Sequence, residues 1–477
     1  MTYSVAMTGP VDDQLRSHLL RADGDEDLCF ALWRPSSGAG RNTGLIVEAV
    51  LPVDGERHIH GNASFESRYF LRATALAAQQ KCGLALLHSH PDAVGWQGMS
   101  EDDTNAERDH AAQAMVLTGL PLVGLTLSGE DRTWSARFWI RTAAREYRAY
   151  WCENVRVVGS QLRISYNPEI LPPPKQDERH ARTVSAWGDL AQAELSRTRV
   201  GVIGLGSVGS AVAECLARIG IVHIKLMDFD TLKEHNLDRC VSATREDLGQ
   251  AKVAVARHYL EKSSTASKPV IQASEFSIVE DAGFRLALDA DVLFCCVDRP
   301  WPRAVLNLIA YAHLIPVVDG GIAIQAGQKG LYGAHWKAHI AAPGRKCLEC
   351  HRQYDPGLVQ AERDGYLDDP RYIEELPEEH EIRRNENVFP FSMNVASLEI
   401  LQFLRMILAP LGISDVGGDD YQFVLGQHQR DESSCRDDCL YSRDFLARGD
   451  TLGVTVTGRH AAAEAARHER TMDQKYG

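Results

Sequence analysis

The strongest limit on the fold of this chain comes from three closely spaced glycines, Gly204, Gly206 and Gly209. They follow a short β-rich run, residues 199–205, and open an apolar segment with helical spacing, residues 207–219. A turn of this kind lets a phosphate approach the N-terminus of the helix, where unpaired N–H groups and the helix dipole favour an anion. The glycines therefore predict an α/β fold with a phosphate site at this turn.

The segments after the glycine turn continue to alternate between strand and helix. Strands are expected at 223–230, 290–298 and 314–321, and helices at 251–262 and 393–408. The last two strand runs are apolar and β-branched, which is typical of strands buried in a parallel sheet. We expect a Rossmann-like domain with a mostly parallel sheet, helices on both faces, and a frayed helix or tail at the end.

The N-terminal part is set apart by a proline-rich segment. Residues 167–177 contain four prolines, three of them consecutive, which favours an extended spacer. We therefore expect an N-terminal α/β domain (1–165), a linker (166–177), a second domain (178–430) and a C-terminal region (431–477). The expected N-terminal elements are strands at 28–33, 44–51, 83–90, 120–127, 134–140 and 155–165, and helices at 64–80 and 101–115.

Composition and charge exclude several classes of protein. The chain has 477 residues, with 51 Lys and Arg against 65 Asp and Glu, and a formal net charge of −14. No block of basic residues occurs, so a nucleic-acid partner is not expected. No apolar run reaches about 18 residues, so no membrane span is expected, and the N-terminus lacks the pattern of a signal peptide. These features predict a cytoplasmic protein.

Two histidines, an aspartate and a serine form a candidate zinc centre. His88 and His90 end a predicted strand, where residues two apart share one side, and Asp103 lies in the next predicted helix. These ligands leave one position of a tetrahedral zinc for water, whose pKa the metal lowers from about 15.7 to about 7. Ser100, one turn before Asp103, can donate a hydrogen bond to a developing oxyanion. Taken alone, the His-x-His pair is better explained as incidental.

The wider pattern, His88-Ser-His90-Pro followed by Ser100-Glu-Asp-Asp103, resembles the JAMM (JAB/MPN) metalloprotease family. The resemblance implies a cytidine-deaminase-like α/β fold for residues 1–165. It also implies zinc-dependent cleavage of peptide or isopeptide bonds next to the C-termini of ubiquitin-like proteins.

The same resemblance implies an upstream glutamate that relays protons between the zinc-bound water and the leaving amine. Glu26 fits that position best, with Asp27 and Glu48 as alternatives. One departure from the family lies in residues 91–99. These nine residues separate the second histidine from the serine, two more than is usual.

The glycine turn on its own suits NAD binding, and the residues that follow it distinguish the possibilities. Asp228 lies 19 positions beyond Gly209 and suits a ribose contact in either case. Further polar residues follow at spacings that a dinucleotide fingerprint does not require: Asp230, Asn236, Arg239, Lys252, Asp298, Arg303 and Asn307. This series resembles the ThiF/MoeB family and the adenylation domains of ubiquitin-activating enzymes over about residues 178–430.

That resemblance implies ATP-dependent adenylation of a C-terminal carboxylate. Asp228 would hold the ribose, Asp230 would belong to the same ATP-binding motif, and Asp298 would lie near Mg²⁺ and the attacking carboxylate. The residues that would surround the phosphates are Asn236, Arg239 and Lys252. Cations and Mg²⁺ are needed because charge develops as pyrophosphate leaves the α-phosphate. Without the resemblance, the arginine and lysine read as surface charges and the asparagine as a turn residue.

Arg182 extends the resemblance to the quaternary structure. It matches a family arginine that reaches across a homodimer to the ATP phosphates of the partner subunit. A solvated arginine on a helix is the alternative.

Four of the eleven cysteines form two close pairs, Cys347/Cys350 and Cys435/Cys439. Without an export signal, such pairs indicate metal ligands before disulfides. The ThiF/MoeB resemblance implies a structural zinc held by four thiolates, and the second spacing is one residue longer than the family's usual one. Four free buried thiols are the alternative.

Family members that form a thioester carry a cysteine before the final helix, but residues 353–392 contain none. We therefore expect the reaction to stop at the adenylate or to pass to a partner's cysteine. Cys240 lies beside Arg239, and we expect its burial to outweigh the arginine and keep the thiol unreactive.

Together these features predict a bifunctional enzyme of a bacterial ubiquitin-like protein system, with ATP, Mg²⁺ and both catalytic and structural Zn²⁺. The adenylation domain would activate the C-terminal glycine of a ubiquitin-like protein, and the peptidase would process its C-terminus or its conjugates, in some such systems as part of phage defence. A conjugating enzyme would then be a partner. The alternatives are sulfur-carrier activation with a sulfurtransferase partner, and a scaffold without catalysis.

Overall fold

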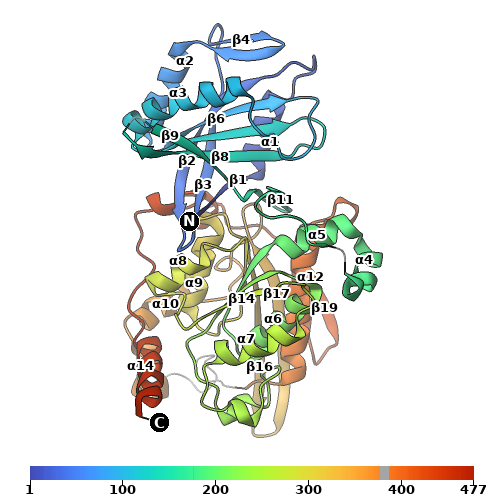
Figure 1. Ribbon diagram of the computed structural model, residues 1–477. Coiled ribbons are helices and arrows are strands. Elements are labelled where there is room, and N and C mark those ends of the chain that lie inside the picture. The colour runs from blue at the N-terminus through green and yellow to red at the C-terminus, as the bar shows by residue number, and fades with distance from the viewer. Residues whose placement is uncertain (145, 176, 376–385, 477) are drawn as a thin grey trace. The chain divides into compact units, whose positions relative to one another are not determined.

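In a computed structural model, residues 1–144, 146–175, 177–375 and 386–476 are described, and they form two compact units (Figure 1). Unit 1 contains Met1–Pro173 together with Ala312–Leu314 and Ala447–Gly453. Unit 2 contains the described residues of Pro174–Tyr311 and Ile315–Leu446 and those from Val454 onward. The boundary between Pro173 and Pro174 falls within the expected linker.

Unit 1 is built on a mixed sheet with the strand order β11-β10-β1-β3-β2-β6-β7-β8-β9. The pairs β1/β10, β1/β3 and β6/β7 are parallel, and the other neighbours are antiparallel. The strands are β1 (Thr2–Thr8), β2 (Leu28–Ser37), β3 (Arg41–Val50), β6 (Gly83–His90), β7 (Leu122–Ser128), β8 (Trp134–Ala143), β9 (Glu146–Trp151), β10 (Asn154–Val158) and β11 (Leu162–Tyr166). A hairpin of β4 (Arg57–His60) and β5 (Asn62–Phe65) stands apart from this sheet.

Three helices pack on the sheet of unit 1: α1 (Gly9–Leu19), α2 (Ser67–Gln79) and α3 (Glu101–Thr118). Alternating residues of β2 face opposite sides. Phe30 packs with residues of α2 and α3, whereas Ala31 packs with residues of α1. This explains why the run at 28–33 is apolar without alternation, since both of its faces are buried.

The far segments of unit 1 are joined to the β2–β3 region by hydrogen bonds. The Ser36 hydroxyl lies 2.8 Å from His313 Nδ1, and the backbone N–H of Ser37 donates to Asp450 at 2.9 Å. Unit 1 therefore includes residues that lie more than 250 positions from its main part in the sequence.

Most elements predicted for residues 1–165 are present, with two differences. The segment expected as strand at 155–165 contains two strands, because the chain turns at residues 159–161 and forms the antiparallel hairpin of β10 and β11. The central strand β1 and the helix α1 were not expected. Both lie in the first 19 residues, where polar residues interrupt the apolar pattern.

Unit 2 contains a second sheet with the order β14-β13-β12-β15-β16-β17-β18-β19. Its four strand pairs from β14 to β16 are parallel and its three pairs from β16 to β19 are antiparallel, so the sheet is mostly parallel, as expected, with an antiparallel extension. The strands are β12 (Arg199–Ile203), β13 (His223–Met227), β14 (Val270–Ser274), β15 (Val292–Cys295), β16 (Val317–Gly327), β17 (Gly330–Ala341), β18 (Gly418–Gln422) and β19 (Gln427–Asp431).

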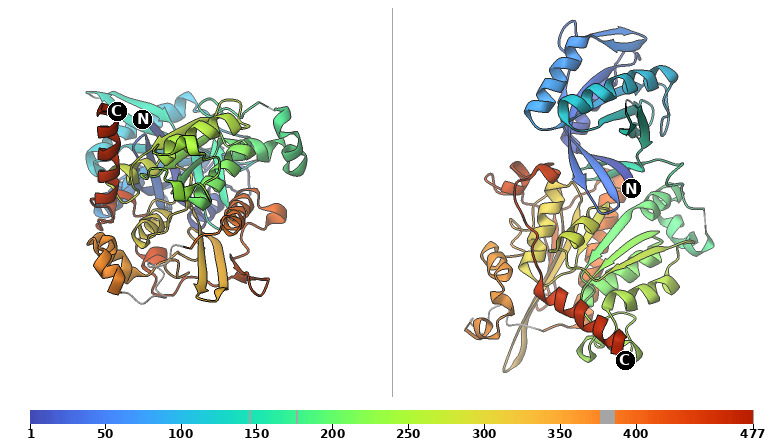
Figure 2. Two further views of the ribbon diagram at one scale, coloured as in Figure 1. Left: turned by 90° about the horizontal axis from the view of Figure 1, so that it is seen from below. Right: turned by 60° about the vertical axis from the view of Figure 1, so that its left-hand side comes forward.

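Helices cover both faces of this sheet, with α6, α7 and α12 on one side and α8 and α9 on the other (Figures 1 and 2). The helices of unit 2 are α4 (Ala181–Trp187), α5 (Asp189–Arg197), α6 (Ser207–Ile219), α7 (Lys252–Ser263), α8 (Asp281–Ala287), α9 (Pro300–Ala312), α10 (Pro356–Arg363), α11 (Pro370–Glu375), α12 (Phe389–Leu408), α13 (Leu440–Arg443) and α14 (Ala461–Tyr476). The expected C-terminal helix is therefore present as α14.

Among the described residues, α12 is the one helix long and apolar enough to span a membrane, by length and composition. Half of its most apolar window is buried inside the protein. Phe391 and Val395 pack against Trp336 of β17, and Phe403 contacts Phe294 of β15. These contacts are those of a core helix on the sheet.

Candidate functional site

Strand β6 and helix α3 bring the three predicted zinc ligands of unit 1 together. His88 and His90 lie on the same face of β6, with 3.2 Å between their Nε2 atoms. Asp103 oxygens lie 3.7 Å from His88 Nε2 and 3.8 Å from His90 Nε2. One ligand atom from each residue lies within 4.8 Å of the others. Two imidazoles and one carboxylate this close fit a zinc ion that keeps a position for water.

Ser100 holds one of these ligands in place. Its hydroxyl donates to Asp103 Oδ2 at 2.7 Å and accepts the Asp103 backbone N–H at 3.0 Å, which forms a capping box at the start of α3. Burial opposes the ionisation of Asp103, but His88 and the hydrogen bonds from Ser100 outweigh it and lower the pKa of this carboxyl. In this geometry Ser100 orients Asp103, and its role toward an oxyanion stays a prediction.

The loop between β6 and α3 is fixed despite its additional residues. The backbone N–H of Gln97 donates to Ser135 Oγ at 2.6 Å, and that of Gly95 donates to Asp131 Oδ2 at 2.9 Å. The Gln97 side-chain oxygen lies 3.4 Å from His90 Nδ1. A partner on the second ring nitrogen orients the first, so this loop aims His90 Nε2 at the candidate metal position.

Of the three acidic candidates for the proton relay, Glu26 lies beside the ligands. Burial raises its pKa, and the charges of His90 and Asp103 also act on it. Asp27 is 1% exposed and pairs instead with Arg57 and with other basic groups of its surroundings. Glu48 accepts a hydrogen bond from a glutamine side chain in an exposed position of β3.

A buried charged network lies under the histidines and was not predicted from the sequence. Arg137 of β8 is fully buried and pairs with Glu107 of α3, with an Nε–Oε2 distance of 2.9 Å. Arg137 also donates to Thr126 Oγ1 at 2.7 Å, and that hydroxyl lies 3.4 Å from His88 Nε2. Burial and Arg137 lower the pKa of His88 to about 3, so the imidazole is neutral, as a metal ligand requires. An arginine inside an otherwise apolar strand was the available signal.

The glycine turn in unit 2 has two positions where a side chain does not fit. Gly204 has φ +91°, and a Cβ there would lie 2.5 Å from the carbonyl oxygen of Cys296. A Cβ at Gly209 would lie 1.9 Å from the Gly204 oxygen. Gly206 has no atom within 4 Å of a built Cβ, so it leaves open space at the start of α6. A phosphate can therefore approach the first turn of this helix.

Asp228 follows β13 and is fixed beside this turn. Its Oδ2 accepts the backbone N–H of Leu205 at 2.7 Å, and its Oδ1 accepts that of Asp230 at 2.7 Å. Burial raises the pKa of Asp228, and the nearby Lys252 opposes this shift. Both carboxylate oxygens keep lone pairs that can accept hydroxyl groups.

The predicted phosphate-binding residues lie around the same loop. Lys252, at the start of α7, pairs with Asp230 at 2.7 Å, and its side chain is 10% exposed. Asn236 is buried and uses its Oδ1 to accept the Lys233 backbone N–H at 2.9 Å. The Arg239 side chain, 25% exposed, contacts residues 235 and 238 of its own loop.

The strand order explains why residues distant in sequence meet here. Strand β12 has β13 on one side and β15 on the other. The strand order therefore runs outward from β12 in both directions, and β12 marks the topological switch point of the sheet. The carboxyl ends of such strands form the ligand site of doubly wound folds. The glycine turn follows β12, Asp228 follows β13, and the exposed Asp298 follows β15.

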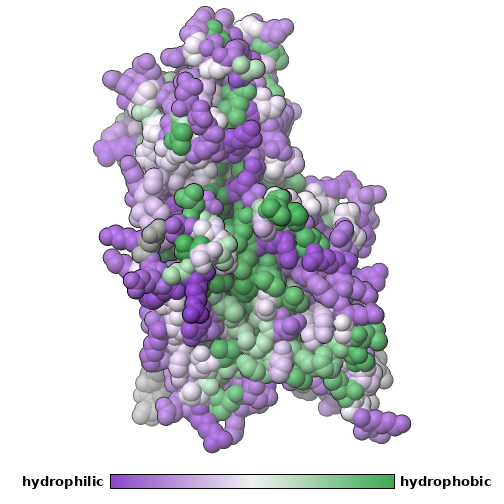
Figure 3. All heavy atoms as spheres, turned by 90° about the vertical axis from the view of Figure 1, so that its right-hand side faces the viewer, coloured by the Kyte–Doolittle hydropathy of each residue, from purple (hydrophilic) through white to green (hydrophobic). Residues whose placement is uncertain are grey.

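Arg182 lies on α4, with its side chain exposed to solvent. The side of unit 2 that has α12 and β19 in Figure 1 carries gathered hydrophobic side chains (Figure 3). The exposed apolar residues of α12 and of the β18–β19 turn are Phe389, Met393, Leu401, Phe423, Val424 and Leu425.

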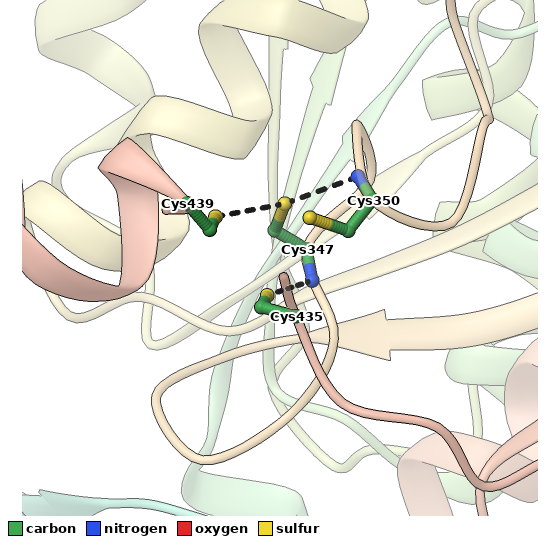
Figure 4. Close-up of side chains that lie close together, drawn as sticks. All are labelled: Cys347, Cys350, Cys435 and Cys439. Carbon is green, nitrogen blue, oxygen red and sulfur yellow. Dashed lines mark hydrogen bonds between the residues drawn. The ribbon is translucent and has the colours of Figure 1, made fainter. Parts of the chain in front are cut away.

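Four cysteines from two distant loops face one another in unit 2 (Figure 4). Cys347 Sγ lies 3.7 Å from Cys439 Sγ, and one ligand atom from each residue lies within 4.8 Å of the others. The backbone N–H of Cys347 donates to Cys435 Sγ at 3.1 Å, and that of Cys350 donates to Cys347 Sγ at 3.3 Å. All four are free thiols. N–H groups directed at sulfur stabilise thiolates, so this donor set fits a tetrahedral zinc ion.

Cys240 lies near the nucleotide-site residues, as its position in the sequence indicates. Burial raises the pKa of its thiol, although Lys252 and Arg239 act in the opposite direction. The direction of this shift agrees with the expectation that burial outweighs the neighbouring positive charge, and the low reactivity of the thiol stays a prediction.

Comparisons with known proteins agree with the geometry of unit 2. The molybdopterin-synthase adenylyltransferase of Escherichia coli K12 is 33% identical over 139 residues, which is 29% of this chain and 54% of that protein. The adenylyltransferase and sulfurtransferase MOCS3 of Culex quinquefasciatus is 27% identical over 172 residues, 36% of this chain and 38% of that protein. The chain thus spans about half or less of the length of these relatives.

Among solved structures, E. coli MccB with ATP is similar at 18% identity and a TM-score of 0.42, over 57% of this chain and 76% of that one. The sequence model of the ThiF family matches residues 178–425, which is more than half of this chain. This chain belongs to the ThiF family.

Proposed function

We propose that unit 2 adenylates the C-terminal glycine of a ubiquitin-like or sulfur-carrier protein, with ATP and Mg²⁺. The observation that carries the proposal is the Asp228 carboxylate, which two backbone N–H groups fix beside the glycine turn and next to the Lys252–Asp230 pair. Two curated relatives that are adenylyltransferases support this assignment.

In this reaction a carboxylate oxygen of the carrier protein attacks the α-phosphorus of ATP, and the bond to the pyrophosphate oxygen breaks. Asp228 accepts the ribose hydroxyls and fixes the nucleotide beside the turn. Lys252 and Arg239 stabilise the negative charge that develops on the leaving pyrophosphate. Mg²⁺, held near Asp298, would neutralise further charge on the phosphates.

Pyrophosphate exchange tests the adenylation. Radiolabelled pyrophosphate should enter ATP when a ubiquitin-like protein ending in glycine is present. Asp298→Ala should lower this exchange by about a hundredfold or more, because the Mg²⁺ that would neutralise the phosphate charge in the transition state loses a ligand. Asp281→Ala is the matched control, since its side chain is 78% exposed at the start of α8. Equal exchange by the two variants would contradict the role of Asp298, and NAD reduction without exchange would favour a dehydrogenase.

We infer a second activity for unit 1, the zinc-dependent hydrolysis of a peptide or isopeptide bond next to such a C-terminus. The specific observation in its favour is that Glu26 lies near enough to His90 and Asp103 for their charges to act on its carboxyl, while Asp103 lies within 3.8 Å of both histidines. Zinc supplies a hydroxide at neutral pH when bound. Glu26 would take the proton of the water and deliver it to the leaving amine, and Ser100 would keep the Asp103 ligand oriented.

Metal analysis tests this centre separately from adenylation. The protein should bind about two zinc ions per chain, one per ligand cluster. Changing both His88 and His90 to Ala should leave about one and abolish cleavage of a ubiquitin-like fusion substrate, with pyrophosphate exchange retained. Changing His58 and His60 to Ala is the control, because these histidines lie on the separate β4–β5 hairpin. Unchanged zinc content in the first variant would refute the metal centre.

The exposed apolar residues of α12 and the β18–β19 turn support a homodimer through unit 2. Arg182 would then reach the phosphates of the partner subunit. Since residues 353–392 contain no cysteine, the adenylate would pass to a conjugating enzyme or a sulfurtransferase. A carrier adduct sensitive to reducing agent on this chain would contradict that order.

A further inference from the structure

The segment of residues 454–471, which includes most of α14, lies outside the part of the chain that matches the ThiF family. It runs along the outside of unit 2 toward the C-terminus (Figure 2). Its contacts join three segments that follow parallel strands of one sheet. These are the loops after β13, β14 and β15, at the edge of the sheet where the nucleotide site lies.

Two contacts reach the loop after β13. The His460 ring meets the Phe229 ring edge-on, with centroids 4.9 Å apart. The Arg470 guanidinium donates to Thr231 Oγ1 at 2.8 Å. Phe229 and Thr231 are the residues on either side of Asp230, which orients Lys252. The segment therefore holds the backbone that carries the ribose and phosphate contacts.

The segment also covers Trp301, three residues beyond Asp298. The indole N–H donates to the Val456 carbonyl at 2.8 Å. A Cβ at Gly458 would lie 3.2 Å from the indole ring, so the chain passes directly over it. Trp301 is 3% exposed, and this cover fixes the start of α9 behind Asp298.

Ion pairs attach α14 to the loop after β14. Arg467 binds Glu280 at 2.6 Å and its guanidinium lies 4.8 Å from the centroid of the Phe276 ring. Arg470 binds Glu275 at 2.5 Å while it also holds Thr231, so one side chain joins the β13 and β14 loops. Charge-assisted hydrogen bonds of this kind are the stronger ones in proteins.

We propose that residues 454–471 are a positioning element of the nucleotide site and that Arg470 is its central residue. The inference rests on the proposed ATP binding by unit 2. By fixing the loops after β13, β14 and β15 relative to one another, the segment removes motion that ATP binding would otherwise have to remove, and so it raises the affinity for ATP. The coupling is reciprocal, so bound ATP stabilises the attachment of the segment.

Titration calorimetry with a non-hydrolysable ATP analogue, the α,β-methylene form, tests the proposal on the full chain. Arg470→Ala should raise the Kd by about tenfold, the effect of losing one net charge-assisted interaction. Arg470→Lys should recover part of the affinity. Arg459→Ala is the control in the same segment, since its side chain is 80% exposed and pairs with Glu464.

Two further readouts separate positioning from general stability. The KM for ATP in pyrophosphate exchange should rise in Arg470→Ala while kcat stays close to the wild-type value, with unchanged zinc content. The analogue should slow hydrogen exchange of residues 454–471 in the wild type. Equal Kd values for the Arg470→Ala and Arg459→Ala variants would overturn this inference alone. Failure of the wild type to bind the analogue would overturn the proposed adenylation with it.

Discussion

Replacing Arg137 with Met is expected to destabilise unit 1 strongly. In the wild type, the Arg137 guanidinium and the Glu107 carboxylate form a pair that is 0% and 1% exposed. The variant leaves Glu107 charged in this buried position, with the Trp139 indole N–H at 2.6 Å as a remaining donor. Breaking a buried pair by removing one partner costs about 3–5 kcal/mol, because the other charge stays buried without compensation.

Hydrogen exchange measured by mass spectrometry can assign this loss to unit 1. Peptides of β6, β7 and β8 should exchange roughly a hundredfold to a few thousandfold faster, which corresponds to about 3–5 kcal/mol. Peptides of β12 and β13 in unit 2 serve as an internal reference. Adding Glu107→Leu to Arg137→Met should reduce the loss, since the double variant removes both buried charges.

The matched control is Arg148→Met, because Arg148 pairs with Glu146 on the surface with side chains that are 70% and 51% exposed. An exposed pair contributes about 0–1 kcal/mol, so little change is expected. If Arg137→Met increased exchange no more than Arg148→Met does, the argument that this buried pair stabilises unit 1 would be refuted.

Three further predictions follow from unit 2. Gly209→Ala should abolish binding of the ATP analogue in calorimetry, because the new Cβ would lie 1.9 Å from the backbone oxygen of Gly204, which cannot move aside as a flexible side chain can. Retained affinity would contradict this geometry. Cys439→Ser should lower the zinc content by about one ion per chain and the melting temperature with it, and unchanged zinc would exclude a four-thiolate site. Burial raises the pKa of Glu362 to about 7. Since a carboxyl whose pKa is raised on folding stays protonated in the folded state, stability falls as pH rises from about 4.5 to about 7. In thermal melts from about pH 4.5 to about pH 7, the Glu362→Gln variant should lose less stability with rising pH than the wild type does. The same pH profile for both proteins would contradict a raised pKa of Glu362.

The sequence was most informative where a site depends on short-range spacing. The pair His88/His90 lies at one strand end, and Ser100 and Asp103 lie in one helical turn, so their proximity follows from local geometry. The glycine turn is equally local. The proximity of the glycine turn, Asp228 and Asp298 could be expected, because the carboxyl ends of parallel strands lie at one edge of the sheet.

The sequence was less informative where partners are far apart. The choice of Glu26 over Asp27 and Glu48 depends on which side chain points toward β6 and α3, and side-chain orientation in a loop cannot be predicted from the sequence. The network of Glu107 and Arg137 joins a helix to a strand 30 residues later. The contact of Arg470 with Thr231 spans 239 residues. The antiparallel strands β17 to β19 have polar and apolar residues without regular alternation, so the sequence pattern does not predict them as strands.

The composition of unit 1 affects how the chain can fold as it is synthesised. Residues 447–453 belong to this unit, and Asp450 accepts a hydrogen bond from the backbone of Ser37. At roughly 5–20 residues per second, the ribosome reaches Asp450 about 15–55 s after Pro173. During that interval the N-terminal sheet must remain without its last segment while unit 2 emerges. We expect a fragment that ends at residue 173 to lack both the Asp450 and the His313 contacts with β2, and therefore to be less stable than unit 1 in the full chain.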